Sequence, residues 1–145
     1  MRTRLRVAAV DDDPYWLAVL GRALAREGIH VELIGDSVRA IEQVVQEPPH
    51  VVITDYNMPH RSGAELACAL RAKLDADCPP LVLVTGDASE LGPNEQRLFD
   101  AVFEKPVRLD TLLRAVEKLA RRRSSGIRLR AQPGPAEDDA DVESG

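Results

Sequence analysis

Short apolar runs that alternate with longer helix-like stretches are the feature that most constrains the fold of this chain. Five runs rich in Val, Ile and Leu occupy residues 5–10, 31–34, 51–54, 81–85 and 101–104. Four of the five are almost wholly apolar, which is typical of strands buried on both faces of a parallel sheet. We therefore predict five parallel strands joined by crossover helices.

The segments between these runs carry apolar residues at helical spacing. The clearest patterns cover residues 17–24, 38–45, 64–73 and 109–119. The segment 89–98 gives the weakest pattern, because Gly92-Pro93 interrupts it. Five strand–helix units predict an α/β fold, in which a doubly wound parallel sheet has helices on both faces and right-handed crossovers.

The length and charge of the chain exclude several classes of protein. With 145 residues it has the size of one ordinary domain, and its formal net charge is −5. A negative charge argues against generic binding to nucleic acid or to an anionic membrane. No apolar run approaches the roughly 20 residues of a membrane span, and the start lacks the long apolar stretch of a signal peptide. We expect a cytoplasmic protein without a membrane segment.

The composition changes near residue 124. From there on the chain is rich in Ser, Gly and Pro and ends in a run of acidic residues. Such a composition cannot bury enough apolar surface to offset the entropy lost on ordering. We divide the chain into a folded domain over residues 1–123 and a disordered acidic tail over residues 124–145. The tail is too short to form a DNA-binding domain, so none is expected.

Polar residues stand directly after four of the predicted strands. They are Asp11-Asp12-Asp13, Asp55, Thr85-Gly86-Asp87 and Lys105-Pro106. Open parallel sheets bind ligands beyond the carboxyl ends of their strands, close to the point where the strand order reverses. We therefore expect several carboxylates, a hydroxyl and an ammonium group to meet at one edge of the sheet.

This combination of groups predicts phosphoryl chemistry. Closely packed carboxylates repel one another unless a cation is present, and oxygen ligands without His or Cys suit Mg²⁺ or Mn²⁺. Asp55 would attack phosphorus and form an acyl phosphate, while the metal and Lys105 offset the phosphoryl charge and Thr85 donates a hydrogen bond. Each residue alone has a simpler explanation. Asp13 before Pro14, for example, is a good helix cap.

The motifs, taken in this order, resemble those of response-regulator receiver domains of two-component signalling. The residues that carry the resemblance are Val10-Asp11-Asp12, Thr54-Asp55-Tyr56-Asn57-Met58-Pro59 with Gly63, Val84-Thr85-Gly86 and Lys105-Pro106. The resemblance covers about residues 5–122. It implies a flavodoxin-like sheet with the strand order 2-1-3-4-5.

The resemblance also implies a metal site and an acceptor. Asp55 is expected to be the phosphoacceptor. The expected metal ligands are Asp11, Asp12, Asp55 and the backbone carbonyl of Asn57. The implied cofactor is Mg²⁺, with Mn²⁺ as a substitute.

The other implied roles concern the phosphoryl group and the partners. Thr85 and Lys105 are expected to contact the phosphoryl group, and Asn57 and Asp87 to tune its lifetime. A histidine kinase or a histidine phosphotransfer protein is the implied donor, and the target is a protein whose affinity changes on phosphorylation. The chain would catalyse its own phosphorylation and hydrolysis without being a conventional enzyme.

One departure from the family and two rival functions stay open at this point. The family often has an aromatic residue three positions before the lysine, where this chain has Val102, and the adjacent Phe103 should face the opposite side of the sheet. One rival is a receiver-like scaffold that binds a partner without phosphorylation. The other is a haloacid-dehalogenase-type phosphatase, whose nucleophile would be Asp11 instead of Asp55.

Overall fold

A computed structural model describes residues 4–124 of the chain. The strands are β1 (Arg6–Val10), β2 (His30–Ile34), β3 (Val51–Thr54), β4 (Leu81–Thr85) and β5 (Ala101–Glu104). The helices are α1 (Pro14–Arg26), α2 (Ser37–Gln46), α3 (Gly63–Leu74), α4 (Pro93–Gln96) and α5 (Leu109–Ser124), with 3-10 turns η1 (Asp75–Asp77) and η2 (Ala88–Glu90). The expected acidic tail lies, from residue 125 onward, outside the described residues.

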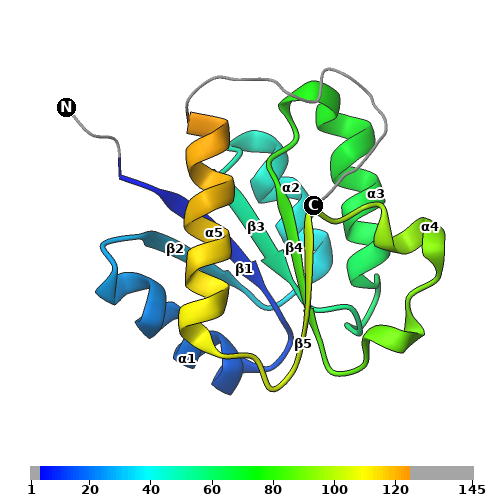
Figure 1. The fold of residues 1–145 in the computed structure, drawn as a ribbon. Helices are drawn as coiled ribbons and strands as arrows, with labels where there is room; N and C mark the ends of the chain where they lie inside the picture. Colours follow the sequence, from blue (N-terminus) through cyan, green and yellow to red (C-terminus); the bar gives the residue numbers. More distant parts are fainter. Residues whose placement is uncertain (1–3, 125–145) are drawn as a thin grey trace.

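The strands form one parallel sheet in the order β2-β1-β3-β4-β5 (Figure 1). This order confirms the predicted doubly wound α/β fold. It makes β1 and β3 neighbours, with Val10 paired to Thr54 at their carboxyl ends. Asp11 and Asp55, the residues that follow these two strands, therefore start from adjacent positions.

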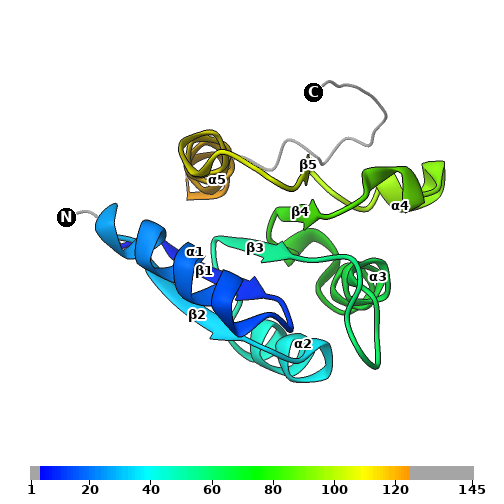
Figure 2. The ribbon, with the colours of Figure 1, turned by 90° about the horizontal axis from the view of Figure 1, so that it is seen from below.

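Helices cover both faces of the sheet, with α1 and α5 on one face and α2 and α3 on the other (Figure 2). Leu20 of α1 and Leu112 of α5 belong to one buried cluster, together with inward-facing strand residues. Leu66 of α3 and Val44 of α2 belong to the second cluster, on the opposite face. The apolar stripes predicted from helical spacing therefore face the sheet from both sides. No helix within residues 4–124 is both long enough and apolar enough to cross a membrane.

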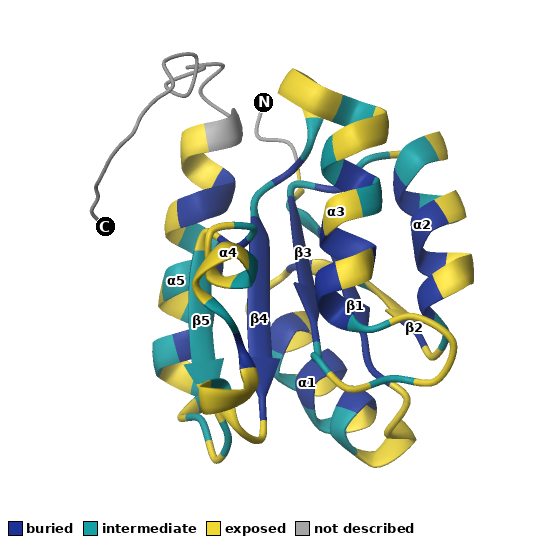
Figure 3. Ribbon diagram, turned by 90° about the vertical axis from the view of Figure 1, so that its right-hand side faces the viewer, coloured by how far each residue is buried: buried dark blue, intermediate teal, exposed yellow. Residues whose placement is uncertain are grey.

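Burial differs between the inner and the outer strands (Figure 3). The inner strands β1, β3 and β4 are buried along almost their whole length, as predicted. In β2 only Ile34 is buried, and β5 has no buried residue. The expectation of burial on both faces is therefore wrong for the two outer strands, because an outer strand has a neighbour on one side only and less cover from the helices.

Local signals in the sequence set where two elements begin. Asp13 caps α1, and its Oδ1 accepts hydrogen bonds from the N–H groups of Tyr15 and Trp16, with Pro14 at the first helical position. This confirms the predicted helix start. Between β4 and β5 the expected helix over 89–98 is reduced to η2 and the four-residue α4, which begins at Pro93.

Candidate functional site

Asp55 lies at the carboxyl edge of the sheet, directly after β3. Its backbone N–H donates to the carbonyl of Val10 at 3.1 Å, so the ladder with β1 continues one residue beyond the strand. Its Oδ1 accepts a hydrogen bond of 2.7 Å from the N–H of Tyr56. Its Oδ2 lies 4.0 Å from Nζ of Lys105, and the side chain is 13% exposed. The carboxylate is therefore held by its own backbone with one oxygen directed towards the ammonium group.

Gly63 shapes the loop that follows Asp55. Its N–H donates to the carbonyl of Tyr56 at 2.7 Å, and a Cβ atom at this position would lie 2.1 Å from the carbonyl oxygen of Asp55. Only glycine permits two backbones to approach this closely. The next helix begins at once, because Ser62 and Glu65 form a reciprocal capping box at the start of α3.

Asp11 is the buried acid of the site. Its side chain is 3% exposed, and its backbone N–H donates to the carbonyl of Ile34 at 3.1 Å. Oδ1 accepts a hydrogen bond of 3.0 Å from the N–H of Asp13, and Oδ2 accepts one of 3.3 Å from Nζ of Lys105. Asp12, the next residue, is exposed.

The three carboxylates converge on one point. Asp11, Asp12 and Asp55 each offer an oxygen, and these oxygens lie within 4.8 Å of one another. Burial raises the pKa of Asp11. Burial is also the largest cause of the raised pKa of Asp55, and the negative charge of Asp11 is the second. A hard divalent cation prefers oxygen ligands and relieves such repulsion, so these side chains fit the chemistry of Mg²⁺.

Lys105 follows the outer strand β5, and its side chain reaches this cluster. Its backbone N–H donates to the carbonyl of Thr85 at 2.7 Å, and its bond to Pro106 is cis. The ammonium group contacts Asp11 and Asp55, and it also lies 5.3 Å from the ring centroid of Trp16. One cation that follows β5 thus faces carboxylates that follow β1 and β3.

The structure gives the other predicted site residues different contacts. Thr85 is fully buried, and its hydroxyl accepts a long contact of 3.5 Å from the N–H of Asp87. Asp87 is exposed and caps η2, where its Oδ1 accepts from both the N–H and the hydroxyl of Ser89. The amide of Asn57 donates to Glu90 at 2.9 Å. The side chains of these residues therefore face η2 and its neighbours.

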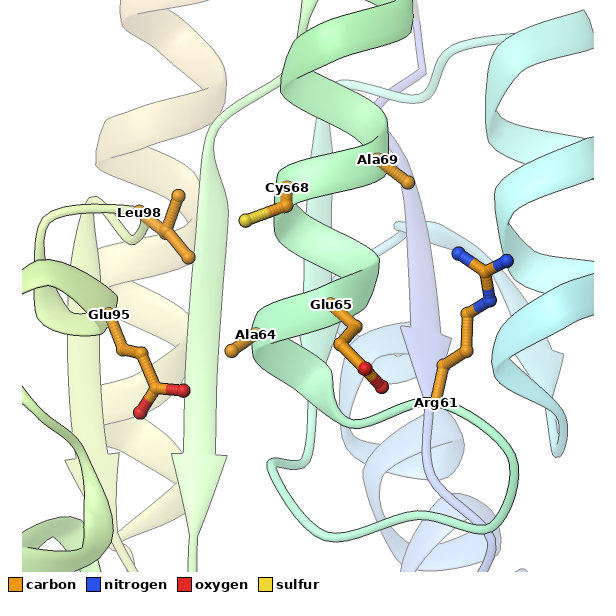
Figure 4. A pocket seen from close by; sticks show the side chains of 7 residues that line it. All are labelled: Arg61, Ala64, Glu65, Cys68, Ala69, Glu95 and Leu98. Carbon is orange, nitrogen blue, oxygen red and sulfur yellow. The ribbon is translucent and has the colours of Figure 1, made fainter.

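A second contact links the loop after Asp55 to α4. The hydroxyl of Tyr56 hydrogen-bonds to the carboxylate of Glu95, at 3.1 and 3.2 Å from its two oxygens. Glu95 also lines a cavity of about 440 Å³ between α3 and α4, which Cys68 and Leu98 border as well (Figure 4). Tyr56, in the loop after Asp55, therefore contacts a residue that lines this cavity.

The two residues before the end of β5 face opposite layers. Val102 packs against the core cluster of α2 and α3, and Phe103 against that of α1 and α5. Phe103 is therefore on the opposite face from the position that an aromatic residue occupies in many receivers, as expected from the alternation of side chains along a strand.

Sequence reasoning missed three contacts of the site, which involve Trp16, Tyr56 and Glu90. Trp16 packs against the core, and its ring also faces the ammonium of Lys105. Its place in the first turn of α1, just after the acidic run, is the signal that could have drawn attention to it. Nothing in the sequence pairs Asn57 with Glu90 or Tyr56 with Glu95.

Comparison with known protein families gives a match over most of the domain. Residues 7–117 match the family described as "Response regulator receiver domain". The chain is 37% identical over 119 residues to the response regulator MprA of Mycobacterium leprae. The aligned region covers 81% of this chain and 52% of that protein. The chain thus spans about half the length of the curated relatives it matches.

Solved structures with the same fold include two bacterial response regulators. The chemotaxis response regulator CheY4 of Vibrio cholerae is 26% identical, with a TM-score of 0.72 over 81% of this chain and 99% of that one. The response regulator TrrA of Thermotoga maritima, solved in complex with Mg²⁺ and BeF, is 26% identical, with a TM-score of 0.73 over 79% of this chain and 98% of that one.

Proposed function

Because this chain belongs to the response regulator receiver domain family, we propose that it accepts a phosphoryl group on Asp55. The proposed donor is a phosphohistidine of a histidine kinase or of a histidine phosphotransfer protein. The proposed setting is the cytoplasm, and the proposed consequence is a changed affinity for a protein partner. The chain itself catalyses the transfer and the later hydrolysis.

The convergence of unlike charges at Asp55 is the observation that carries this proposal. Three carboxylate oxygens lie within 4.8 Å of one another, and a single ammonium lies 3.3 Å from Asp11 and 4.0 Å from Asp55. Structural ion pairs place one acid beside one base. An excess of acid beside one lysine leaves room for a divalent cation, and the lysine can then contact an incoming phosphoryl group.

The chemical step uses Asp55 as the nucleophile. A carboxylate oxygen forms a bond to phosphorus while the bond from phosphorus to the donor imidazole nitrogen breaks, and the imidazole keeps the electron pair and takes up a proton. Oδ2 faces Lys105, so a phosphoryl group on this oxygen lies within reach of the ammonium. In hydrolysis, water attacks phosphorus, and the carboxylate leaves with the electron pair of the broken P–O bond.

The proposed metal ligands are Asp11, Asp12, Asp55 and the backbone carbonyl of Asn57. Bound there, Mg²⁺ would supply positive charge that offsets the phosphoryl oxygens. The oxygen-only donor set supports this assignment, as does the related TrrA, which was solved in complex with Mg²⁺ and BeF. Thr85 is the proposed hydroxyl donor to the phosphoryl group, because it ends β4 beside β3 and, among the described residues, its own hydroxyl has only a long contact.

We assign the tuning of the phosphoryl lifetime to Asn57 and Asp87. Both residues follow the strand ends of the site, and both are exposed to the solvent from which the attacking water comes. Replacing either residue by Ala should change the half-life of the phosphorylated chain, measured by intact mass after the phosphodonor is removed. Unchanged half-lives in both variants would withdraw this assignment.

The proposed output passes through the segment between β4 and β5. Tyr56 and Asn57, the two residues after the acceptor, hydrogen-bond to Glu95 and Glu90 of that segment. A rearrangement of the acceptor loop therefore acts directly on η2 and α4. Such a switch operates only if the partner binds the two states with different affinity.

The proposal is tested by intact mass after incubation with acetyl phosphate and Mg²⁺. We expect the wild-type chain to gain one phosphoryl group, and we expect no gain without Mg²⁺ or in Asp55→Ala. If the gain persists in Asp55→Ala and is lost in Asp11→Ala, the hypothesis of a haloacid-dehalogenase-type phosphatase replaces the proposed function. If the folded wild type gains no phosphoryl group from acetyl phosphate or from a phosphohistidine donor, the hypothesis of a receiver-like scaffold replaces the proposed function.

A further inference from the structure

The ring of Trp16 lies beneath the ammonium of Lys105. The distance from Nζ to the ring centroid is 5.3 Å, which is within the range of a cation–π contact. We propose that Trp16 is a positioning residue, whose ring holds the Lys105 ammonium over the acceptor site. This inference rests on the proposed function, in which Lys105 contacts the phosphoryl group.

The path of the Lys105 side chain explains why positioning is needed. β5 is an outer strand, and β4 and β3 separate it from β1, which Asp11 directly follows. The lysine side chain has four rotatable methylene groups, and it is 29% exposed. Such a side chain loses much rotational freedom when it is fixed in one place. A flat ring that covers the ammonium restricts where this side chain can extend.

The first turn of α1 fixes the ring. Asp13 accepts a hydrogen bond of 3.4 Å from the backbone N–H of Trp16, and the indole is half-buried against the core cluster of α1 and α5. The ring is therefore held by packing against the core of the domain. Asp13 follows Asp11 and Asp12, so the same short segment supplies the metal-binding carboxylates and the support for the lysine.

The ring differs from the carboxylate partners of Lys105 in one respect. Asp11 and Asp55 are proposed metal ligands, and a divalent cation beside them weakens their attraction for an ammonium group. The quadrupole of an indole ring carries no net charge, and its attraction does not depend on the metal. Trp16 is therefore the contact that keeps Lys105 in place when the metal is bound.

The test uses two substitutions of Trp16 and one control in the same helical turn. Trp16→Phe keeps an aromatic face, and Trp16→Leu keeps apolar volume without one. Tyr15→Leu removes the neighbouring aromatic ring, at a residue that is 78% exposed. We expect the rate constant for phosphorylation by acetyl phosphate with Mg²⁺ to fall about fivefold in Trp16→Leu and about twofold in Trp16→Phe. Tyr15→Leu should keep the wild-type value.

A second readout reports the contact without any phosphorylation. The chain has three lysines, Lys73, Lys105 and Lys118. With ¹³C-labelled lysine, the ε-methylene signal of Lys105 is assigned by its loss in Lys105→Gln. The ring current should shift its proton resonance upfield in wild type with and without Mg²⁺, less so in Trp16→Phe, and not at all in Trp16→Leu.

The two readouts separate this inference from the proposed function. An unshifted Lys105 signal, or one that loses its shift when Mg²⁺ is added, overturns the positioning role. A wild-type rate constant in Trp16→Leu overturns it as well, and so does an equal loss in Trp16→Phe and Trp16→Leu, which would indicate a packing role only. If the wild type takes up no phosphoryl group, the proposed function fails, and the NMR signal alone decides whether Trp16 positions Lys105.

Discussion

At the amino ends of the strands, polar side chains complete the hydrogen bonds of the sheet, whereas at the carboxyl ends carboxylates face one another. At the amino ends, Nδ1 of His50 accepts from the N–H of Arg6 at 2.9 Å, and Oδ2 of Asp100 accepts from the N–H of Leu81 at 2.8 Å. Asp100 also pairs with Arg71 at 3.2 Å. Each of these polar groups accepts a hydrogen bond, and the carboxylate of Asp100 also has a partner of opposite charge.

At the carboxyl ends the balance is different. Asp11, Asp12 and Asp55 lie together with only Lys105 as a cation in contact among the described residues. Burial and mutual repulsion make the charged state of such a cluster costly. The amino edge thus serves stability, and the carboxyl edge gives up some stability to keep the proposed site for a cation and a phosphoryl group. Four predictions test this contrast.

The largest expected effect is on the phosphorylation rate of Lys105→Gln. Among the described residues, the variant loses the only ammonium that faces Asp55, so the initial rate of phosphoryl gain from acetyl phosphate should fall about 100-fold, as when a group that stabilises transition-state charge is removed. Intact mass over time measures the rate. Lys73→Gln, on the exposed surface of α3, is the matched control. A loss of less than twofold would remove Lys105 from the mechanism.

The second prediction concerns stabilisation by Mg²⁺. A ligand that binds only the folded state adds about 2.7 kcal/mol to the free energy of unfolding at 100 times its dissociation constant. Urea unfolding with and without Mg²⁺ should show such a gain in wild type and a much smaller one in Asp12→Asn. Asp100→Asn, at the opposite edge, should respond as wild type does. An equal gain in all three chains would place the cation elsewhere.

The third prediction concerns the amino edge. Asp100→Ala leaves the N–H of Leu81 without its acceptor and Arg71 without its ion pair, so the free energy of unfolding should fall by about 2 kcal/mol. Asp100→Asn keeps an acceptor oxygen and should lose less. Phosphorylation rates should stay at the wild-type value in both. A slower rate in a folded Asp100→Ala chain would show that the two edges are coupled.

The same contrast indicates what the sequence could predict. The inner strands and the helices α1, α2, α3 and α5 were predicted correctly, because fully buried parallel strands and one-sided helices leave strong patterns. The strand order came from the resemblance to receivers and was confirmed. Once β1 and β3 are neighbours, Asp11 and Asp55 must start close together, so the convergence of the acids follows from topology.

Contacts made by long side chains could not be predicted in this way. Lys105 was expected at the site, but its ammonium lies over the ring of Trp16, a residue far away in the sequence that no local pattern connects with it. The partners of Asn57 and Tyr56 depend on the path of the segment between β4 and β5, which has only a weak helix pattern. Partial exposure of β2 and β5 depends on their outer positions, which apolar content alone does not reveal.

The smallest expected effect is a pH-dependent gain in stability for Asp11→Asn without metal. Burial raises the pKa of Asp11, and burial with the charge of Asp11 raises that of Asp55. The folded chain therefore keeps these protons to higher pH than the unfolded chain, whose carboxyls titrate near 3.8. Where the folded state binds more protons, stability falls as the pH rises. The loss of stability begins near pH 3.8 and increases with pH. It is complete once both carboxyls are ionised in the folded chain, above their raised pKa values.

Replacing Asp11 by Asn removes one ionisation and relieves Asp55 of a neighbouring charge. In urea unfolding with a chelator present, the difference in free energy of unfolding between variant and wild type should shift in favour of the variant as the pH rises from 4 to 7, by about 1 kcal/mol. With Mg²⁺ added at pH 7 the shift should reverse, since the variant lacks a proposed ligand. If the difference in free energy of unfolding does not change with pH, repulsion between the acids does not destabilise the carboxyl edge. The acids there would then be compensated by their partners, as at the amino edge.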